Sequence, residues 1–97
     1  MNENKTVLIT GASRGIGRAC AVELAKAGFS LVLNSRGPSE AMDETVRLCT
    51  ELGASLRTCF FDVGSADAAR TAIEADIEAH GAYWGILLNS KKRTGRT

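Results

Sequence analysis

The feature that most constrains the fold is a turn with three glycines, TGASRGIG, at residues 10–17. It stands directly after a short apolar run, TVLI at residues 6–9, and directly before a helix-like stretch, RACAVELAKA at residues 18–27. Gly28 follows at the position where glycine commonly ends a helix. A strand, a glycine turn and a helix in this order are typical of the first half of a βαβ unit. The sequence therefore predicts a sheet that begins with this unit.

The alternation of strand and helix continues along the chain. Strands are predicted in the apolar runs at residues 29–34, 55–61 and 83–89. Helices are predicted between them, one with Pro38 in its first turn and ended by Gly53, and one capped by Ser65 and ended by Gly81. The order βαβαβαβ predicts an α/β fold, namely a Rossmann-like doubly wound parallel sheet truncated after about four strands.

Each predicted helix carries apolar side chains at helical spacing, and these are expected to face the sheet. They are Ile16, Cys20, Leu24 and Ala27 in the first helix, Ala41, Thr45, Leu48 and Leu52 in the second, and Ala69, Ile73 and Ile77 in the third.

Composition narrows the class of protein. The 97 residues are 44% hydrophobic and 24% charged, as in an ordinary globular domain. No apolar run approaches 18 residues, and the polar first residues do not resemble a secretory signal, so no contact with a membrane is expected. Cys20, Cys49 and Cys59 are odd in number and never form a C-x-x-C pair. We therefore expect neither a disulfide framework nor a metal site, and a cytoplasmic location.

A glycine turn between the first strand and the first helix is a typical anion site. Unpaired N–H groups at a helix N-terminus carry a partial positive charge that suits a pyrophosphate. Gly11 is expected to allow the tight turn, Gly15 to let the phosphates approach, and Gly17 to let helix and strand pack closely. The spacing G-x-x-x-G-x-G without G-K-[ST] disfavours a nucleoside triphosphatase. A glycine turn without a ligand is the alternative.

The residues after the second strand indicate which dinucleotide is bound. An NAD site usually has an acid about 20 residues after the turn, for the ribose 2′-hydroxyl. Here the sequence is Asn34, Ser35 and Arg36. Arg36 and Arg14 are expected to face a 2′-phosphate, with Ser35 as a further donor, because a guanidinium is a charged fork that matches phosphate. This favours NADP(H) over NAD(H). Solvation of both arginines is the alternative.

TGASRGIG, the following NSR, FDV at residues 61–63 and GILLN at residues 85–89 resemble the short-chain dehydrogenase/reductase family, and in particular its 3-oxoacyl-acyl-carrier-protein reductase branch. The resemblance covers residues 5–89. It implies an NADPH-dependent oxidoreductase of fatty acid biosynthesis. It also implies a homo-tetramer and, in a full-length form, an acyl carrier protein thioester as substrate.

The resemblance adds three candidate site residues. It implies that Asp62 contacts the adenine amino group, that Val63 lies beside it through its backbone, and that Asn89 supports the end of the fourth strand near the adenine ribose. Asp62 also follows a strand, where doubly wound sheets bind ligands, although a turn or capping role is the alternative. The candidate cofactor-binding residues are Gly11, Ser13, Arg14, Gly15, Ile16, Gly17, Asn34, Ser35, Arg36, Asp62, Val63 and Asn89.

The family's chemistry requires a serine and a Tyr-x-x-x-Lys pair, in which a cation makes the tyrosine a usable acid. Tyr83 is the only tyrosine, and Leu87 stands four residues later. No catalytic residue is therefore assigned, and Tyr83 is expected to pack in the core. The fourth strand is expected to be an exposed apolar edge, because no further strand follows it.

The end of the chain differs in composition from the rest. After Asn89 the family's N-A-G is replaced by Ser90 and Lys91, and the last seven residues contain four basic residues and no acid. We expect an NADP-binding Rossmann half-domain at residues 1–89 and a basic, disordered tail at residues 90–97 that arose by truncation or frameshift. Without aromatic residues the tail does not predict nucleic-acid binding. Two alternatives to a truncated reductase stay open: a non-catalytic dinucleotide-binding module, and a small interaction protein with a basic tail.

Overall fold

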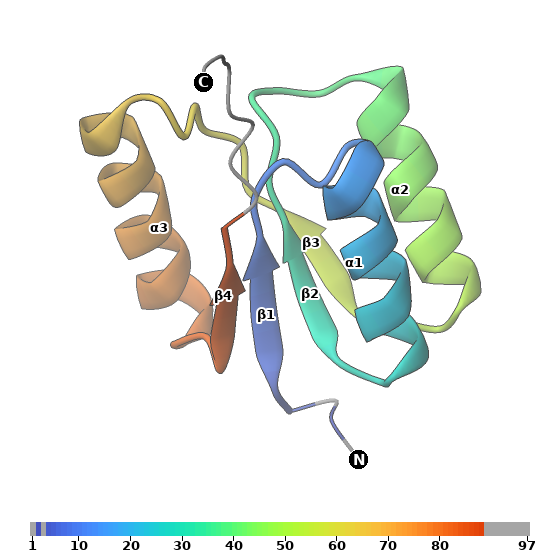
Figure 1. Cartoon of the computed structure of the whole chain (residues 1–97). Coiled ribbons are helices and arrows are strands. Elements are labelled where there is room, and N and C mark those ends of the chain that lie inside the picture. Colours follow the sequence, from blue (N-terminus) through green and yellow to red (C-terminus); the bar gives the residue numbers. More distant parts are fainter. Residues whose placement is uncertain (1, 3, 89–97) are drawn as a thin grey trace.

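A computed structural model describes residues 2 and 4–88 of the chain. Asn89 and the predicted tail at residues 90–97 lie outside the described residues. Strands and helices alternate along the described part, and the predicted order βαβαβαβ is confirmed (Figure 1). The elements are β1 (Thr6–Ile9), α1 (Gly15–Lys26), β2 (Ser30–Leu33), α2 (Glu40–Glu51), β3 (Leu56–Thr58), α3 (Ala66–His80) and β4 (Gly85–Leu87).

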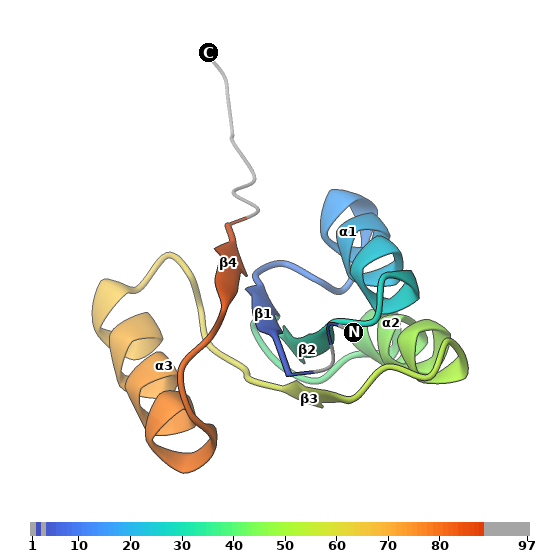
Figure 2. The same cartoon turned by 90° about the horizontal axis from the view of Figure 1, so that it is seen from below.

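The four strands of the described part form one parallel sheet in the order β3-β2-β1-β4. The chain therefore builds outward from β1 in both directions, because β2 and β3 lie on one side of β1 and β4 lies on the other. Helices α1 and α2 cover one face of the sheet, and α3 lies on the opposite face (Figure 2). This is the predicted Rossmann-like arrangement, and the strand order reverses at β1, where such sheets bind ligands.

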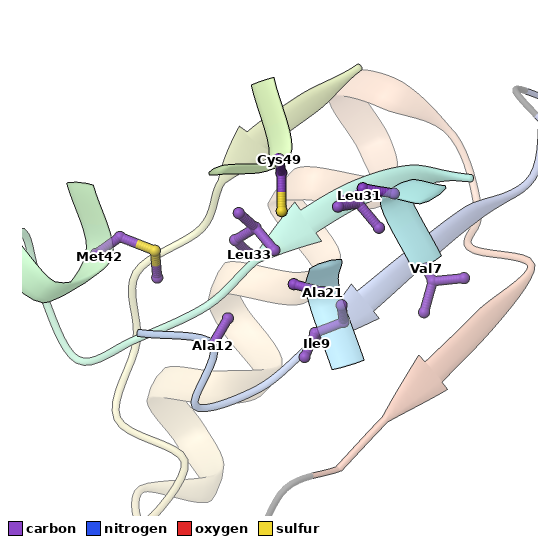
Figure 3. Packing of buried hydrophobic residues seen from close by; sticks show 9 residues of the cluster. Val7, Ile9, Ala12, Ala21, Leu31, Leu33, Met42 and Cys49 are labelled. Carbon is purple, nitrogen blue, oxygen red and sulfur yellow. The ribbon is translucent and has the colours of Figure 1, made fainter. Parts of the chain in front are cut away.

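The main core lies between the sheet and the helices α1 and α2. Successive side chains of a strand point to opposite faces, and Val7, Ile9, Leu31 and Leu33 point toward these helices and are buried. Ala21 of α1 and Met42 and Cys49 of α2 meet them (Figure 3). The intervening residues Leu8 and Val32 are fully buried too. Strands that are buried on both faces explain why the runs in the sequence are apolar without alternation.

The predicted apolar stripe of α1 is correct only in part, because Leu24 is partly buried and packs against the core but does not belong to the fully buried face. The buried residues of α1 are Gly17, Ala21 and Ala25, whereas Ile16 is 70% exposed and Ala27 is exposed. Small side chains at every fourth position let the helix axis approach the sheet closely. The larger side chains Val22 and Leu24 are only partly buried where they pack against the core.

The buried face of α2 was predicted only in part. Thr45 is buried as expected, but Met42 and Cys49 accompany it, and Leu52 is 42% exposed. The helix begins at Glu40, after the N-cap Ser39, whose hydroxyl accepts a hydrogen bond from the Met42 N–H at 3.1 Å. Pro38 therefore precedes the cap instead of lying in the first turn.

The other predicted helix ends are confirmed. The Ser65 hydroxyl accepts a hydrogen bond of 3.2 Å from the Ala68 N–H at the start of α3. Gly28 and Gly81 have φ of 92° and 99° directly after α1 and α3. These left-handed conformations favour glycine and end each helix.

Helix α3 and strand β4 form the least buried part of the fold. No residue of α3 is fully buried, Ile86 and Leu87 of β4 are 49% and 40% exposed, and Leu88 after β4 is 77% exposed. Among the described residues, β4 pairs only with β1. The predicted apolar edge is therefore present. No helix in the described part of the chain is long and apolar enough to cross a membrane.

Candidate functional site

The candidate site lies at the carboxyl end of the parallel strands, where the loops after β1, β2 and β3 meet. The Ala12 N–H donates to the Asn34 carbonyl at 2.8 Å, which joins the first two loops. The Phe61 N–H donates to the Ser35 carbonyl at 3.1 Å, which joins the second and third. The sheet thus brings together three segments that are far apart in the sequence and that contain eleven of the twelve candidate cofactor-binding residues.

The glycine turn has the conformation that its sequence predicts. Gly11 and Gly15 have φ of 60° and 62°, in the left-handed region that other residues rarely adopt. A Cβ atom at Gly15 would meet no heavy atom within 4 Å, so backbone conformation, not packing, selects glycine there. Gly17 is buried at the start of α1, as the close packing of helix and strand requires. The space beside Gly15 is open to a ligand.

The N-terminus of α1 presents unpaired amides. Arg14 is the N-cap residue, and its side chain makes no capping hydrogen bond. Within residues 2 and 4–88, no hydrogen bond takes up the N–H groups of residues 13–17. Consecutive unpaired amides at a helix N-terminus carry partial positive charge and form a site for a phosphate or another anion.

Asn34 connects the glycine turn to the end of β3. Its side chain is buried, at 1% exposure, and its Oδ1 accepts a hydrogen bond of 3.2 Å from the Gly11 N–H. Its Nδ2 donates to the carbonyls of Cys59, Phe61 and Ser35 at 3.0, 3.1 and 3.2 Å. Both the oxygen and the nitrogen of the Asn34 side-chain amide therefore form hydrogen bonds within the protein. Asn34 lies at the site, where it holds two of the three loops.

The two arginines that were predicted to recognise a 2′-phosphate are exposed. Arg14 follows β1 and Arg36 follows β2, so they lie on the loops of neighbouring strands. In the described part of the chain, neither guanidinium makes a hydrogen bond or an ion pair. Ser35 is 9% exposed, and its hydroxyl donates to the Gly37 carbonyl at 2.9 Å. Its oxygen keeps the capacity to accept a hydrogen bond.

Asp62 and Val63 occupy an exposed turn after β3. Asp62 Oδ1 accepts a hydrogen bond of 2.8 Å from the Gly64 N–H, and its carbonyl accepts one of 3.0 Å from the Ser65 N–H. The carboxylate therefore has a role in the turn, which is the alternative that the sequence left open, while Oδ2 makes no hydrogen bond within the described residues. Val63 is 55% exposed beside it.

Sequence reasoning missed two residues that contact the glycine turn, Arg18 and Thr45. The side chains of both make hydrogen bonds to carbonyl groups of the turn. The available signal was a threonine in an otherwise apolar stripe of α2, which suggests a buried hydroxyl with a specific partner. Of the other candidate residues, Ser13 lies in the turn before α1, and Ile16 lies in the first turn of α1 with its side chain exposed.

Tyr83 lies at the other end of the sheet, just before β4. It is half-buried, and its hydroxyl donates a hydrogen bond of 2.6 Å to Asp76. Burial, together with this hydrogen bond, raises the pKa of Tyr83. A tyrosine that acts as a catalytic acid near neutral pH needs a shift in the opposite direction. The residues described here also contain no group of three or more side chains suited to hold a metal ion.

Comparisons with known proteins agree with this geometry. The sequence model of the short chain dehydrogenase family matches residues 5–91. The 3-oxoacyl-[acyl-carrier-protein] reductase FabG of Aggregatibacter actinomycetemcomitans is 45% identical over 87 residues, which are 90% of this chain and 36% of that relative. The short-chain dehydrogenase/reductase homolog YusS of Bacillus subtilis is 37% identical over 92 residues, which are 94% of this chain and 83% of that protein.

Solved structures resemble the fold as a whole. Acetoin dehydrogenase YohF from Salmonella typhimurium has a TM-score of 0.81 at 27% identity, over 93% of this chain and 37% of its own. Carveol dehydrogenase from Mycobacterium avium in complex with NAD has a TM-score of 0.75 at 30% identity, over 89% of this chain and 35% of its own. The chain thus spans little more than a third of the length of the reductase and of both structures.

Proposed function

The chain belongs to the short chain dehydrogenase family, and we propose that it binds NADP(H) as the coenzyme-binding part of a reductase. The family consists of oxidoreductases that use a nicotinamide dinucleotide, and carveol dehydrogenase was solved in complex with NAD. When bound, such a coenzyme supplies or accepts a hydride. The residues of this chain are proposed to act by holding that coenzyme in place.

The unpaired amides of residues 13–17 carry the proposal. They stand at the N-terminus of α1, with open space beside Gly15, where the strand order reverses. A pyrophosphate has the negative charge and the acceptor oxygens that can pair with such amides. The adenosine half of the coenzyme is proposed to lie over the loops after β2 and β3, with Asp62 and Val63 at the adenine.

The preference for NADP(H) is supported by charge. Arg14 and Arg36 stand on neighbouring loops, and neither pairs with an acid within the described residues. An unpaired guanidinium offers two parallel donors to a phosphate. The segment at residues 34–37 contains no carboxylate for the 2′-hydroxyl of NAD(H). We therefore propose that the 2′-phosphate is recognised between these two arginines.

The identity to the FabG reductase supports a 3-oxoacyl thioester of acyl carrier protein as the substrate of a longer protein of this type, with a role in fatty acid biosynthesis. Assembly as a tetramer belongs to that longer form as well. The three free cysteines support a reducing compartment such as the cytoplasm.

A second candidate function is a dinucleotide-binding module without catalysis. The raised pKa of Tyr83 and its hydrogen bond to Asp76 favour it, because the one tyrosine of the chain is engaged away from the glycine turn. The two candidates share the coenzyme site and differ only in turnover.

A fluorescence titration with NADPH and NADH tests the coenzyme site. We expect NADPH to bind more tightly, and Arg36→Ala to raise its Kd about tenfold or more, because hydrogen bonds to a charged group are lost. The NADH Kd is expected to stay constant. Arg47→Ala is the matched control, since Arg47 is exposed on α2 and pairs with Glu44 and Glu51.

Two outcomes would contradict this proposal: no binding of NADPH by folded protein, or equal weakening of NADPH and NADH by Arg36→Ala. Addition of a 3-oxoacyl thioester to the NADPH complex then separates the two candidate functions. Oxidation of NADPH supports the reductase, and unchanged NADPH supports the module.

A further inference from the structure

Thr45 places a buried hydroxyl against the glycine turn. The side chain is fully buried on α2, and its Oγ1 lies 2.8 Å from the Ala12 carbonyl and 3.2 Å from the Ser13 carbonyl. A threonine within a helix commonly bonds back to the carbonyl four residues earlier. Here that oxygen, of Ala41, is the farthest of the three at 3.4 Å. The single proton of the hydroxyl is therefore directed at the turn.

Arg18, on α1, donates hydrogen bonds to two of the same carbonyls and to Thr45 itself. Its Nη2 donates to the Ser13 carbonyl at 2.7 Å and to the Ala41 carbonyl at 2.8 Å, and its Nε donates to Thr45 Oγ1 at 3.0 Å. One guanidinium thus joins the glycine turn, the first turn of α2 and the buried hydroxyl. Within the described residues no carboxylate forms an ion pair with Arg18, and the acceptors of its hydrogen bonds are all neutral.

These contacts fix the direction of two peptide groups. In a trans peptide, the carbonyl of one residue and the N–H of the next point in opposite directions, and no peptide bond among the described residues is cis. The carbonyls of Ala12 and Ser13 point toward Thr45 and Arg18. The N–H groups of Ser13 and Arg14 consequently point away from α2, and they belong to the amides of the candidate site that make no hydrogen bond within the described residues.

We propose that Arg18 and Thr45 are positioning residues that keep the amides of the glycine turn directed at the pyrophosphate of the coenzyme. The proposal rests on the proposed function, because it deepens the role of the same site. A turn that contains Gly11 and Gly15 has the backbone freedom to rotate its peptides. A rotated peptide would present a carbonyl oxygen to the phosphate and repel it. By holding the two carbonyls, the side chains of Arg18 and Thr45 prevent this rotation without contacting the ligand.

Binding of two ligands by Thr45→Val tests this role. NADPH contains the pyrophosphate, whereas adenosine 2′-monophosphate contains only the adenosine and the 2′-phosphate. We expect Thr45→Val to raise the NADPH Kd about tenfold, as the loss of one well-placed hydrogen bond does, and to leave the Kd of adenosine 2′-monophosphate within about twofold. Thr45→Ser keeps the hydroxyl and is expected to restore NADPH binding. Thr50→Val, at an exposed position of the same helix, is expected to change neither Kd.

A purely structural role for Thr45 would weaken both ligands together, and that result, or an unchanged NADPH Kd, overturns the proposal. Arg18→Lys keeps the positive charge but not the fork. Arg18→Lys is expected to raise the Kd of NADPH but not that of adenosine 2′-monophosphate. It replaces Thr45→Val in this comparison if the Thr45 variant fails to fold.

A measurement without ligand separates this proposal from the proposed function. In the NMR spectrum of the free protein, Thr45→Val is expected to shift the amide signals of Ser13 and Arg14, while Thr50→Val leaves them in place. Unchanged signals would contradict the proposal. Failure of the unaltered protein to bind NADPH would refute the proposed function alone.

Discussion

The hydroxyl of Tyr83 lies 2.6 Å from a carboxylate oxygen of Asp76. The same carboxylate accepts two hydrogen bonds, of 2.9 and 2.7 Å, from the guanidinium of Arg57 on β3. Asp76 therefore joins α3 to β3 and to the segment before β4. Because no residue of α3 is fully buried, these polar contacts matter more for its position than they would for α1 or α2.

The Asp76 contacts predict loss of stability in acid. The hydrogen bonds from Arg57 hold the pKa of the Asp76 carboxyl below its usual range. A carboxyl whose pKa is lower in the folded state stabilises the protein above about pH 4, its unfolded pKa, and that contribution is lost as the pH falls through the folded pKa. We expect Asp76→Asn to lower the free energy of unfolding by about 2 kcal/mol at pH 7. The difference is expected to shrink below about pH 4.

Urea unfolding followed by circular dichroism at pH 7 and pH 3 measures both effects. Asp67→Asn is the control, because Asp67 forms an exposed pair with Arg70 on the same helix and its loss is expected to leave stability unchanged. A difference between the Asp76 variant and the unaltered protein that is as large at pH 3 as at pH 7 would rule out the ionic explanation.

The conformation of Gly15 predicts an effect on binding beyond the effect on stability. Gly15→Ala places a side chain at φ of 62°, which costs about 1 kcal/mol of unfolding free energy. The new methyl group meets no protein atom within 4 Å, and it lies where the phosphate is proposed to approach. We therefore expect weaker NADPH binding in a protein that still folds.

Gly28→Ala is the matched control for that variant. Gly28 ends α1 at φ of 92°, so alanine is strained there as well, but at the end of the helix remote from the turn. Thermal unfolding should show both variants to be destabilised, and the fluorescence titration should show a raised NADPH Kd for Gly15→Ala alone. Equal Kd values for the two variants would indicate that the region beside Gly15 is not used by the ligand.

The buried amide of Asn34 predicts a large cost for an isosteric change. In Asn34→Asp an acceptor replaces the Nδ2 donor and faces the carbonyl oxygens of Cys59, Phe61 and Ser35. Burial of repelling acceptors is expected to lower the free energy of unfolding by about 3 kcal/mol or more at pH 7. Denaturant unfolding measures this loss. Asn2→Asp changes an exposed amide that donates to the Ala27 carbonyl, and it should have a much smaller effect.

Much of the fold followed from local patterns in the sequence. The strands, the glycines that end α1 and α3 and the cap at Ser65 were all predictable, because each depends on a few neighbouring residues. The buried face of α1 was not. Hydrophobicity favours Ile16, which is exposed, whereas the structure buries Gly17, Ala21 and Ala25, since the distance between helix and sheet is set by the whole fold.

The candidate site was predictable in its position but not in its supporting contacts. The glycine spacing indicated where a phosphate would lie, and the strand order confirmed that the predicted loops come together. Asn34 was predicted as a cofactor-binding residue, and its side-chain amide forms hydrogen bonds with carbonyls and with a backbone N–H whose directions are known only from the folded loops. The contacts of Thr45 and Arg18 could not be predicted from the sequence for the same reason.

The central place of β1 in the sheet also bears on how the chain folds. The Thr10 side chain at the end of β1 donates a hydrogen bond to the Leu87 carbonyl, across a sequence separation of 77 residues. Contacts between such distant residues require closure of a long loop, and they slow folding. On the ribosome, the first strand and its glycine turn are made early, but they acquire one of their two neighbouring strands only after β4 has left the exit tunnel. Until then, the backbone edge of β1 that later pairs with β4 lacks its partner strand.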